Sequence, residues 1–163
     1  MKGSPKPYLL YVGNDYPHKN LKRLKLAFEK LIKQGLDYEL VLAGTDSFVD
    51  DEELDKLYRN AELFIFPSLS EGFGLPPLEA MARGVAVTCS NIPCLVEILG
   101  NAAIYFNPLD IDDIAEKIKK VLLDKDLKDE LIKRGYERIK KYNWQKMAEE
   151  TLETYNSILR LEH

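Results

Sequence analysis

Five short apolar segments, separated by stretches of helical periodicity, limit the fold of this chain more than any other feature. Each segment ends in turn-forming residues, and its apolar positions run continuously rather than alternating with polar ones, which is typical of strands buried on both faces. The segments are residues 8–13, 38–44, 63–68, 85–90 and 103–106. Because strands that alternate with helices form parallel sheets covered on both faces, we predict an α/β fold with a doubly wound parallel sheet.

The intervening segments carry helix signals. Asn20 is placed to cap the first helix and Gly35 to end it, and acidic residues open the second, where they suit the helix dipole. The predicted helices are residues 20–35, 50–61, 75–84, 92–100 and 110–123, with further C-terminal helices between about 126 and 160. Trp144 lies in a helical context, and we interpret it as a packing anchor on the domain body.

The amino-acid composition is typical of an ordinary globular protein. The 163 residues are 45% hydrophobic and 31% charged, with a net charge of −4. Basic and acidic residues are interspersed, which excludes a nucleic-acid footprint. We expect a single domain over residues 7–160, with residues 1–6 and 161–163 derived from an expression vector.

The two cysteines favour a reducing compartment, the cytoplasm, because they are too few for a disulfide framework and lack the histidines of a zinc site. Cys89, at the end of a strand, is expected to be buried. No apolar run reaches the length of a membrane span, and membrane association of a longer, full-length protein is left open.

The segment EGFGLPPLEA, residues 71–80, holds Glu71 and Glu79 eight positions apart around two glycines and two prolines. In one interpretation the glycines form a loop, the prolines start a helix, and both carboxylates are solvated. In the other, the loop and the helix N-terminus make a ligand site into which both carboxylates point. The neighbouring segments must decide between the two.

Ligands of open parallel sheets bind beyond the carboxyl ends of the strands, where strand order reverses, and we expect the first and third strands to meet there. The helix after EGFG would present its N-terminus at that point, and such an end attracts phosphate. Lys19, in the loop after the first strand, can add positive charge, although a lysine in such a loop is usually only solvated. Since carboxylates accept hydrogen bonds from hydroxyls, Glu71 and Glu79 suit a ligand with a sugar on each side of its phosphates, a nucleotide sugar.

Four stretches carry a resemblance to a known family and cover most of residues 7–122: PYLLYVGN with PHKNLKRL, YELVLAG, EELDKLYRNAELFIFPSLSEGFGLPPLEAMARGVAVTCSN, and LVEILGNAAIYFNP. They resemble the carboxyl-terminal nucleotide-sugar-binding domain of retaining GT-B glycosyltransferases, the glycosyl transferases group 1 of glycosyltransferase family 4. The E-x7-E signature from Glu71 to Glu79 is specific to this family, and G-N-x-x-P-H-K-N, which begins at Gly13, supports it.

The resemblance implies roles for individual residues. Glu71, as the catalytic residue, would contact the donor sugar near its reacting carbon, and Glu79 would bind the ribose hydroxyls. Lys19 would hold the diphosphate and counter the charge that grows as the nucleoside diphosphate leaves. Gly13 and Asn14 would border the donor, and backbone amides would assist at Phe73, Gly74 and Leu75.

The implied reaction transfers a hexose such as mannose or glucose, with retention, from a UDP- or GDP-sugar to an acceptor hydroxyl, with no metal and no cofactor.

Three departures from the family pattern stand out. Many relatives place an arginine on the diphosphate where this chain has Asn14, so phosphate affinity is lower here or His18 or Arg23 compensates. Val96 replaces a proline, a minor change.

Between residues 44 and 51 only TDSFVD remains where relatives carry another helix and strand. In the sheet order 3-2-1-4-5-6 the strand lost is the outer one beside residues 38–44, and we predict that the exposed edge promotes pairing with another chain, as a homodimer.

The family's amino-terminal acceptor domain is also absent, so we expect donor binding without efficient transfer. A noncatalytic α/β scaffold that keeps the motif without binding is the alternative. A dinucleotide-dependent enzyme is disfavoured because GNDYPHKN, and not G-x-G-x-x-G, follows the first strand. A nucleophilic triad is disfavoured because His18 and His163 have no serine or cysteine at a recognisable elbow.

Overall fold

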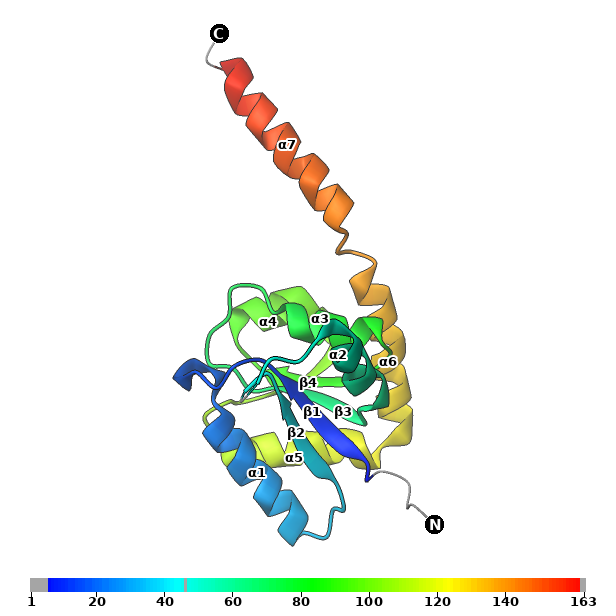
Figure 1. The fold of residues 1–163 in the computed structure, drawn as a ribbon. Coiled ribbons are helices and arrows are strands. Elements are labelled where there is room, and N and C mark those ends of the chain that lie inside the picture. The colour runs from blue at the N-terminus through cyan, green and yellow to red at the C-terminus, as the bar shows by residue number, and fades with distance from the viewer. Residues whose placement is uncertain (1–5, 46, 162–163) are drawn as a thin grey trace.

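The computed structural model describes residues 6–45 and 47–161. Its centre is a five-stranded parallel sheet in the order β2-β1-β3-β4-β5 (Figure 1). The strands are β1 Tyr8–Val12, β2 Glu39–Ala43, β3 Leu63–Phe66, β4 Val87–Ser90 and β5 Ala103–Phe106. This is the predicted doubly wound order with its outermost strand absent, so the predicted fold class is confirmed.

Helices cover both faces of the sheet. They are α1 Leu21–Lys33, α2 Asp51–Asn60, α3 Leu75–Ala82, α4 Pro93–Leu99, α5 Ile111–Leu123, α6 Lys125–Ile139 and α7 Trp144–Leu161, with short 3-10 turns η1 Pro17–Lys19 and η2 Gly100–Ala102. Helices α1 and α5 pack together on one face, while α3 contacts α2 and α6 on the other (Figure 1). Aspartate side chains cap α2, α5 and α6 by accepting backbone N–H groups of the first turn.

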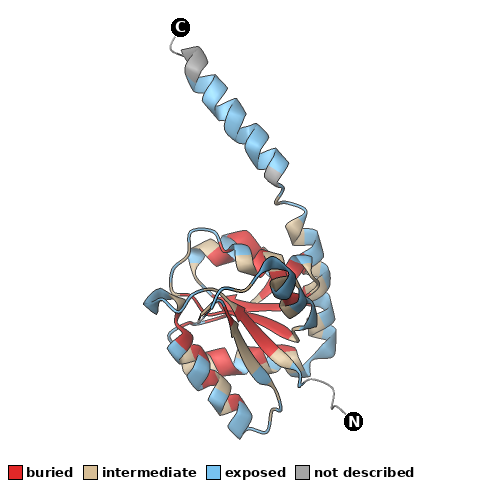
Figure 2. Ribbon diagram, in the orientation of Figure 1, coloured by how far each residue is buried: buried red, intermediate tan, exposed pale blue. Residues whose placement is uncertain are grey.

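The core lies along the central strands. Every residue of β3 and β4 is buried (Figure 2). Aromatic rings extend this core: Tyr58 lies 5.7 Å from Phe64 and Tyr11 lies 6.2 Å from Phe66, measured between ring centroids. Each such side chain contributes about 1.5–3 kcal/mol by burial. Cys89 is fully buried in β4, as predicted.

Strand β2 is less buried than its apolar run alone indicates, although the absent outer strand predicts an exposed edge at this position. The apolar run over residues 38–44 indicates a buried strand, yet only Ala43 is buried in β2, and Leu40, Val41 and Leu42 are only partly buried. The reason is position: β2 pairs with β1 on one side, and it ends the sheet on the other. Residues at an edge strand lose the neighbours that would bury them.

Helix α7 extends away from the domain (Figure 1), and its described side chains are exposed (Figure 2). The predicted C-terminal helical stretch is thus two helices, separated at residues 140–143. Trp144 begins α7, but its side chain lies outside the described residues, so its role as a packing anchor stays a prediction. In the part of the chain that the structure describes, no helix is both long and apolar enough to cross a membrane.

Candidate functional site

The loops after β1 and β3 meet at the carboxyl edge of the sheet. The two strands pair directly, with Leu9 opposite Leu63. Just beyond their ends the backbone N–H of Leu69 donates to the carbonyl oxygen of His18 at 2.7 Å. The predicted meeting of the first and third strands is therefore correct, and it places residues 13–20 beside residues 67–74.

The side chain of Asn20 stabilises this junction, but not by capping the first helix as its sequence position predicts. It stands at the N-cap position of α1, but its side chain caps no backbone N–H of the helix. Instead Nδ2 donates to the carbonyl oxygens of Pro67 at 3.1 Å and Pro108 at 2.7 Å, and Oδ1 accepts from Arg23. The predicted capping role is wrong because a backbone φ of 60° turns the side chain toward the neighbouring loops. Three loops at the carboxyl edge are thereby joined through one buried amide.

Lys19 and Glu71 form an ion pair across the same junction. Lys19 Nζ lies 2.7 Å from Glu71 Oε1, and the two side chains are only 14% and 12% exposed. Lys19 also lies over the ring of Phe66, 5.4 Å from its centroid. The two residues that the sequence singles out as diphosphate and sugar contacts are therefore brought together, and the lysine is held in the crevice rather than solvated.

Glu79 is fixed by a residue that the sequence analysis does not identify. The hydroxyl of Tyr58, on α2, donates to Glu79 Oε2 at 2.9 Å. Arg83, the residue that directly follows α3, donates to the Glu79 carbonyl oxygen, and its guanidinium lies 5.0 Å from the centroid of the Tyr58 ring. In the sequence, Tyr58 occupies an ordinary core position of an amphipathic helix, so nothing in its local pattern predicts this contact.

The start of α3 presents unpaired backbone donors. Gly74 precedes the helix with a φ of 92°, and a Cβ at this position would lie 2.6 Å from Leu95 Cδ2. Pro76 and Pro77 follow in the first turn and have no N–H to offer. Among the hydrogen bonds of the described residues, the N–H groups of Phe73, Gly74 and Leu75 have no acceptor. These amides form the donor set that an anion would meet at this helix end.

A cavity of about 550 Å³ opens beyond the ends of β1 and β2. Gly13 and Asn14 line it, together with Gly44, Phe48 and Leu54. The Asn14 side chain accepts a hydrogen bond from the backbone N–H of Tyr16, so its amide is oriented by its own loop. The ring of Phe48 is 91% exposed at the rim, a free apolar surface beside the cavity.

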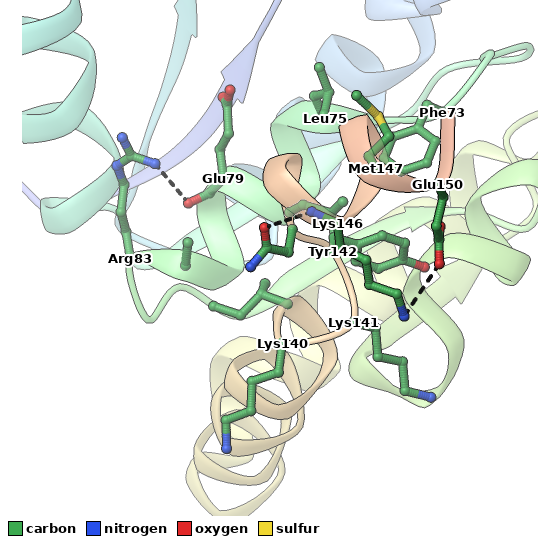
Figure 3. A pocket seen from close by; sticks show the side chains of 14 residues that line it. Phe73, Leu75, Glu79, Arg83, Lys140, Lys141, Tyr142, Lys146, Met147 and Glu150 are labelled. Carbon is green, nitrogen blue, oxygen red and sulfur yellow. Dashed lines mark hydrogen bonds and ion pairs between the residues drawn. The ribbon is translucent and has the colours of Figure 1, made fainter. Parts of the chain in front are cut away.

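A second cavity, of about 910 Å³, lies between α3 and the start of α7 (Figure 3). Phe73, Leu75 and Glu79 line it from one side, and Tyr142 and residues of α7 from the other. The Phe73 ring meets Tyr142 edge to face at 5.6 Å. In Figure 3 the Glu79 carboxylate points away from the lysines of the α6–α7 connection, so this cavity is not centred on the carboxylate. Glu71 lines neither of the two cavities, and the structure does not join both glutamates in one of them.

The raised pKa values of several buried groups predict that the fold loses stability at alkaline pH. Burial raises the pKa of Tyr58, and the Glu79 carboxylate raises it further. Burial likewise raises the pKa of Tyr11, Tyr105 and Cys89. Above about pH 10 the unfolded tyrosines release protons that the folded state retains, so the stability that is complete below that pH is lost as the pH rises.

We therefore expect the free energy of unfolding to fall by about 1.4 kcal/mol per pH unit for each such group above its unfolded pKa. Urea unfolding between pH 8 and pH 11 measures this slope. Tyr58→Phe removes one titrating group, so its slope is smaller by one such increment. Equal slopes in the two proteins would show that Tyr58 does not stay protonated in the fold.

Comparison with protein families decides the relationship of the chain. The model for "Glycosyl transferases group 1" matches residues 47–138, more than half of the 163 residues. The chain belongs to the glycosyl transferases group 1 family. The match starts within residues 45–50, the segment where one helix–strand unit is predicted to be absent.

Relatives of this group 1 domain include mannosyltransferases. O-antigen chain mannosyltransferase B of Escherichia coli is 33% identical over an alignment of 175 residues. The alignment covers 93% of this chain and 46% of that protein. The serotype-specific mannosyltransferase WbdA of Escherichia coli is 39% identical over 122 residues, 75% of this chain and 15% of that protein. The chain thus spans about half the length of the first relative and much less of the second.

The group 1 domain is also shorter than its relatives. The match to O-antigen chain mannosyltransferase B runs over 175 residues, about 23 more than the roughly 152 residues of this chain that take part. That difference fits the absent helix–strand unit, since a helix and a strand with their loops need about 20–30 residues.

Solved structures agree with the fold of the group 1 domain. The domain superposes on S. aureus TarM, crystallised with UDP among other ligands, with a TM-score of 0.80 at 20% identity, covering 93% of this chain and 36% of that one. It superposes on sucrose-phosphate synthase from Thermosynechococcus elongatus with a TM-score of 0.78 at 24% identity, covering 96% and 46%. The predicted relationship to the carboxyl-terminal domain of GT-B glycosyltransferases is confirmed.

Proposed function

We propose that this domain is the donor-binding half of a retaining glycosyltransferase and holds a nucleoside diphosphate sugar at the carboxyl edge of its sheet. The observation that carries the proposal is the sheltered Lys19–Glu71 pair, set beside the free amides that begin α3. A cation and a helix N-terminus together form a diphosphate site. Lys19 and the amides of Phe73, Gly74 and Leu75 hold the phosphates.

The nucleoside occupies the cavity lined by Gly13, Asn14 and Phe48. Glycine lets the ligand approach the backbone, and the exposed Phe48 ring offers a face on which a base can stack. Glu79, on α3, lines the 910 Å³ cavity and not the nucleoside cavity, but it binds the ribose hydroxyls from its position beside α2. Its partner Tyr58 lies one helical turn from Leu54, which lines the nucleoside cavity.

The donor sugar lies next to Glu71, which accepts hydrogen bonds from its hydroxyls once the ligand draws Lys19 toward the phosphates. In transfer, the bond between the anomeric carbon and the phosphate oxygen breaks, a new bond forms from that carbon to the acceptor oxygen, and the acceptor proton is released. Negative charge then grows on the departing diphosphate, where Lys19 and the α3 dipole counter it.

The sugar is a hexose such as mannose, a choice supported by the names of the two mannosyltransferase relatives. The acceptor site is proposed to lie on the other half of a full-length protein, since the chain spans about half of O-antigen chain mannosyltransferase B. We therefore expect this chain to bind a donor without efficient transfer. Robust turnover by the 163-residue chain alone would contradict that division of roles.

Ligand-dependent thermal unfolding tests the proposal. A nucleotide sugar at about 100 times its Kd stabilises the fold by about 2.7 kcal/mol, which raises Tm by about 5–10 °C in a domain of this size. GDP, UDP, GDP-mannose and UDP-glucose are compared with guanosine and uridine, which lack the diphosphate and should shift Tm little. A noncatalytic scaffold predicts no shift with any of the six.

A further inference from the structure

We propose that two copies of this chain associate through the open edge of β2, which pairs with itself antiparallel across a two-fold axis and joins the two sheets into one. The proposal is independent of donor binding. It rests on the direction of the backbone groups of β2, on the exposure of its side chains, and on the arrangement of charge along the edge.

The backbone of β2 presents unused hydrogen-bonding groups away from β1. Glu39 N–H donates to Pro7 O and Ala43 O accepts from Gly13 N–H, so these two residues face β1. Alternate residues of a strand direct their N–H and C=O groups to opposite sides, which turns those of Leu40 and Leu42 to the open edge. Within residues 6–45 and 47–161, neither of these two N–H groups has an acceptor.

We place the two-fold axis at Leu40, the middle of the three outward-facing residues Tyr38, Leu40 and Leu42. The Thr45 hydroxyl donates to Leu42 O at 3.2 Å. A two-fold pair centred on Leu40 leaves that bond in place: the two Leu40 residues exchange N–H and C=O reciprocally, and Leu42 N–H reaches Tyr38 O of the second copy. Four inter-chain hydrogen bonds result from the symmetric arrangement. A register centred further along would pair fewer of these outward-facing residues with one another.

A second copy suits this edge better than an unrelated strand because the edge is self-complementary. In the Leu40-centred register, Glu39 lies opposite Val41 of the second copy and Asp37 lies opposite Ala43, so no carboxylate meets another. Like charges placed directly opposite would destabilise the pair.

The exposed carboxylate of Glu39 is the one charge on β2 that would oppose pairing. Residues 38–43 contain no proline and no lysine, and three consecutive aliphatic residues are only partly buried. Edge strands of soluble proteins normally carry such a residue or are covered by another element. Pairing with a second copy removes this exposed edge from both chains.

Sedimentation velocity of the intact chain from 5 μM to about 500 μM tests the association, with the larger species at twice the chain mass expected to dominate at the upper end. Leu40→Lys places like charges opposite each other at the two-fold axis and should raise the dimer Kd at least tenfold. Ile104→Lys makes the matched change on β5, the opposite edge strand, and should leave the dimer unchanged. A monomeric parent chain at all concentrations, or an Ile104→Lys defect equal to that of Leu40→Lys, overturns the proposal.

Disulfide trapping tests the register without relying on a charged variant. Reciprocally bonded residues of antiparallel strands have Cα atoms about 5.5 Å apart, within the range that a disulfide spans. In a Cys94→Ser background, Leu40→Cys should form a covalent dimer on mild oxidation, whereas Leu42→Cys, offset from the axis, should form much less. Equal trapping at the two positions, or none at Leu40→Cys, contradicts this pairing.

Discussion

Replacing Lys19 by methionine is expected to weaken the binding of a nucleoside diphosphate sugar about a hundredfold, which corresponds to about 2.7 kcal/mol. The methionine side chain fills similar space but provides neither the charge nor the donors that reach the phosphates. Charge-assisted hydrogen bonds contribute about 1.5–3 kcal/mol each, so the loss of one or two accounts for the effect. Isothermal titration calorimetry with the donor that gives the largest Tm shift measures it.

The same substitution should also reduce stability. It leaves the Glu71 carboxylate, whose side chain is 12% exposed, without its partner, and removes a cation over the Phe66 ring. We expect a loss of about 1–3 kcal/mol in the free energy of unfolding. Combining Lys19→Met with Glu71→Gln removes the orphaned charge and should restore stability without restoring affinity. Unchanged affinity in the single variant would place the diphosphate elsewhere.

Asn20→Ala should destabilise the domain by about 2–4 kcal/mol. The side chain is 5% exposed and donates two hydrogen bonds, to Pro67 O and Pro108 O, which the alanine leaves buried and unpaired. Alanine also tolerates the φ of 60° less well than asparagine does. Urea unfolding followed by circular dichroism gives the change in free energy.

Two further variants of Asn20 separate these causes. Asn20→Gly keeps the backbone conformation without strain and loses only the hydrogen bonds, so it should be less destabilising than alanine. Asn20→Asp keeps shape and backbone preference but turns a carboxylate toward two carbonyl oxygens, so it should be at least as destabilising as alanine. If glycine and alanine behave alike, backbone strain contributes little. If aspartate is tolerated, the two hydrogen bonds do not stabilise the junction.

Much of the architecture follows from local patterns. Each of the five apolar runs became a strand, because continuous β-forming segments bounded by turns have few alternatives in an α/β chain. The single run that behaves differently is β2, whose sequence resembles that of the buried strands. Burial there depends on whether another strand lies alongside, and a strand's own residues do not encode its neighbour.

The capping role of Asn20 was wrong for a related reason. Asparagine before a helical pattern usually accepts from the first turn, and the same side chain can instead donate to any carbonyl that the fold brings near. Here the carbonyls come from positions 67 and 108, far along the chain. No local signal ranks those distant acceptors above the helix amides.

Residue type and spacing point to the family, the parallel α/β fold and the candidate residues Lys19, Glu71 and Glu79, because these features survive in a linear pattern. Which side chains meet depends on the folded chain: Lys19 with Glu71, and Glu79 with Tyr58. The open edge of β2 was predicted from a gap in the sequence, but the direction of its free N–H groups depends on its pairing with β1. Such contacts join residues distant in sequence, and their geometry exists only once the sheet has assembled.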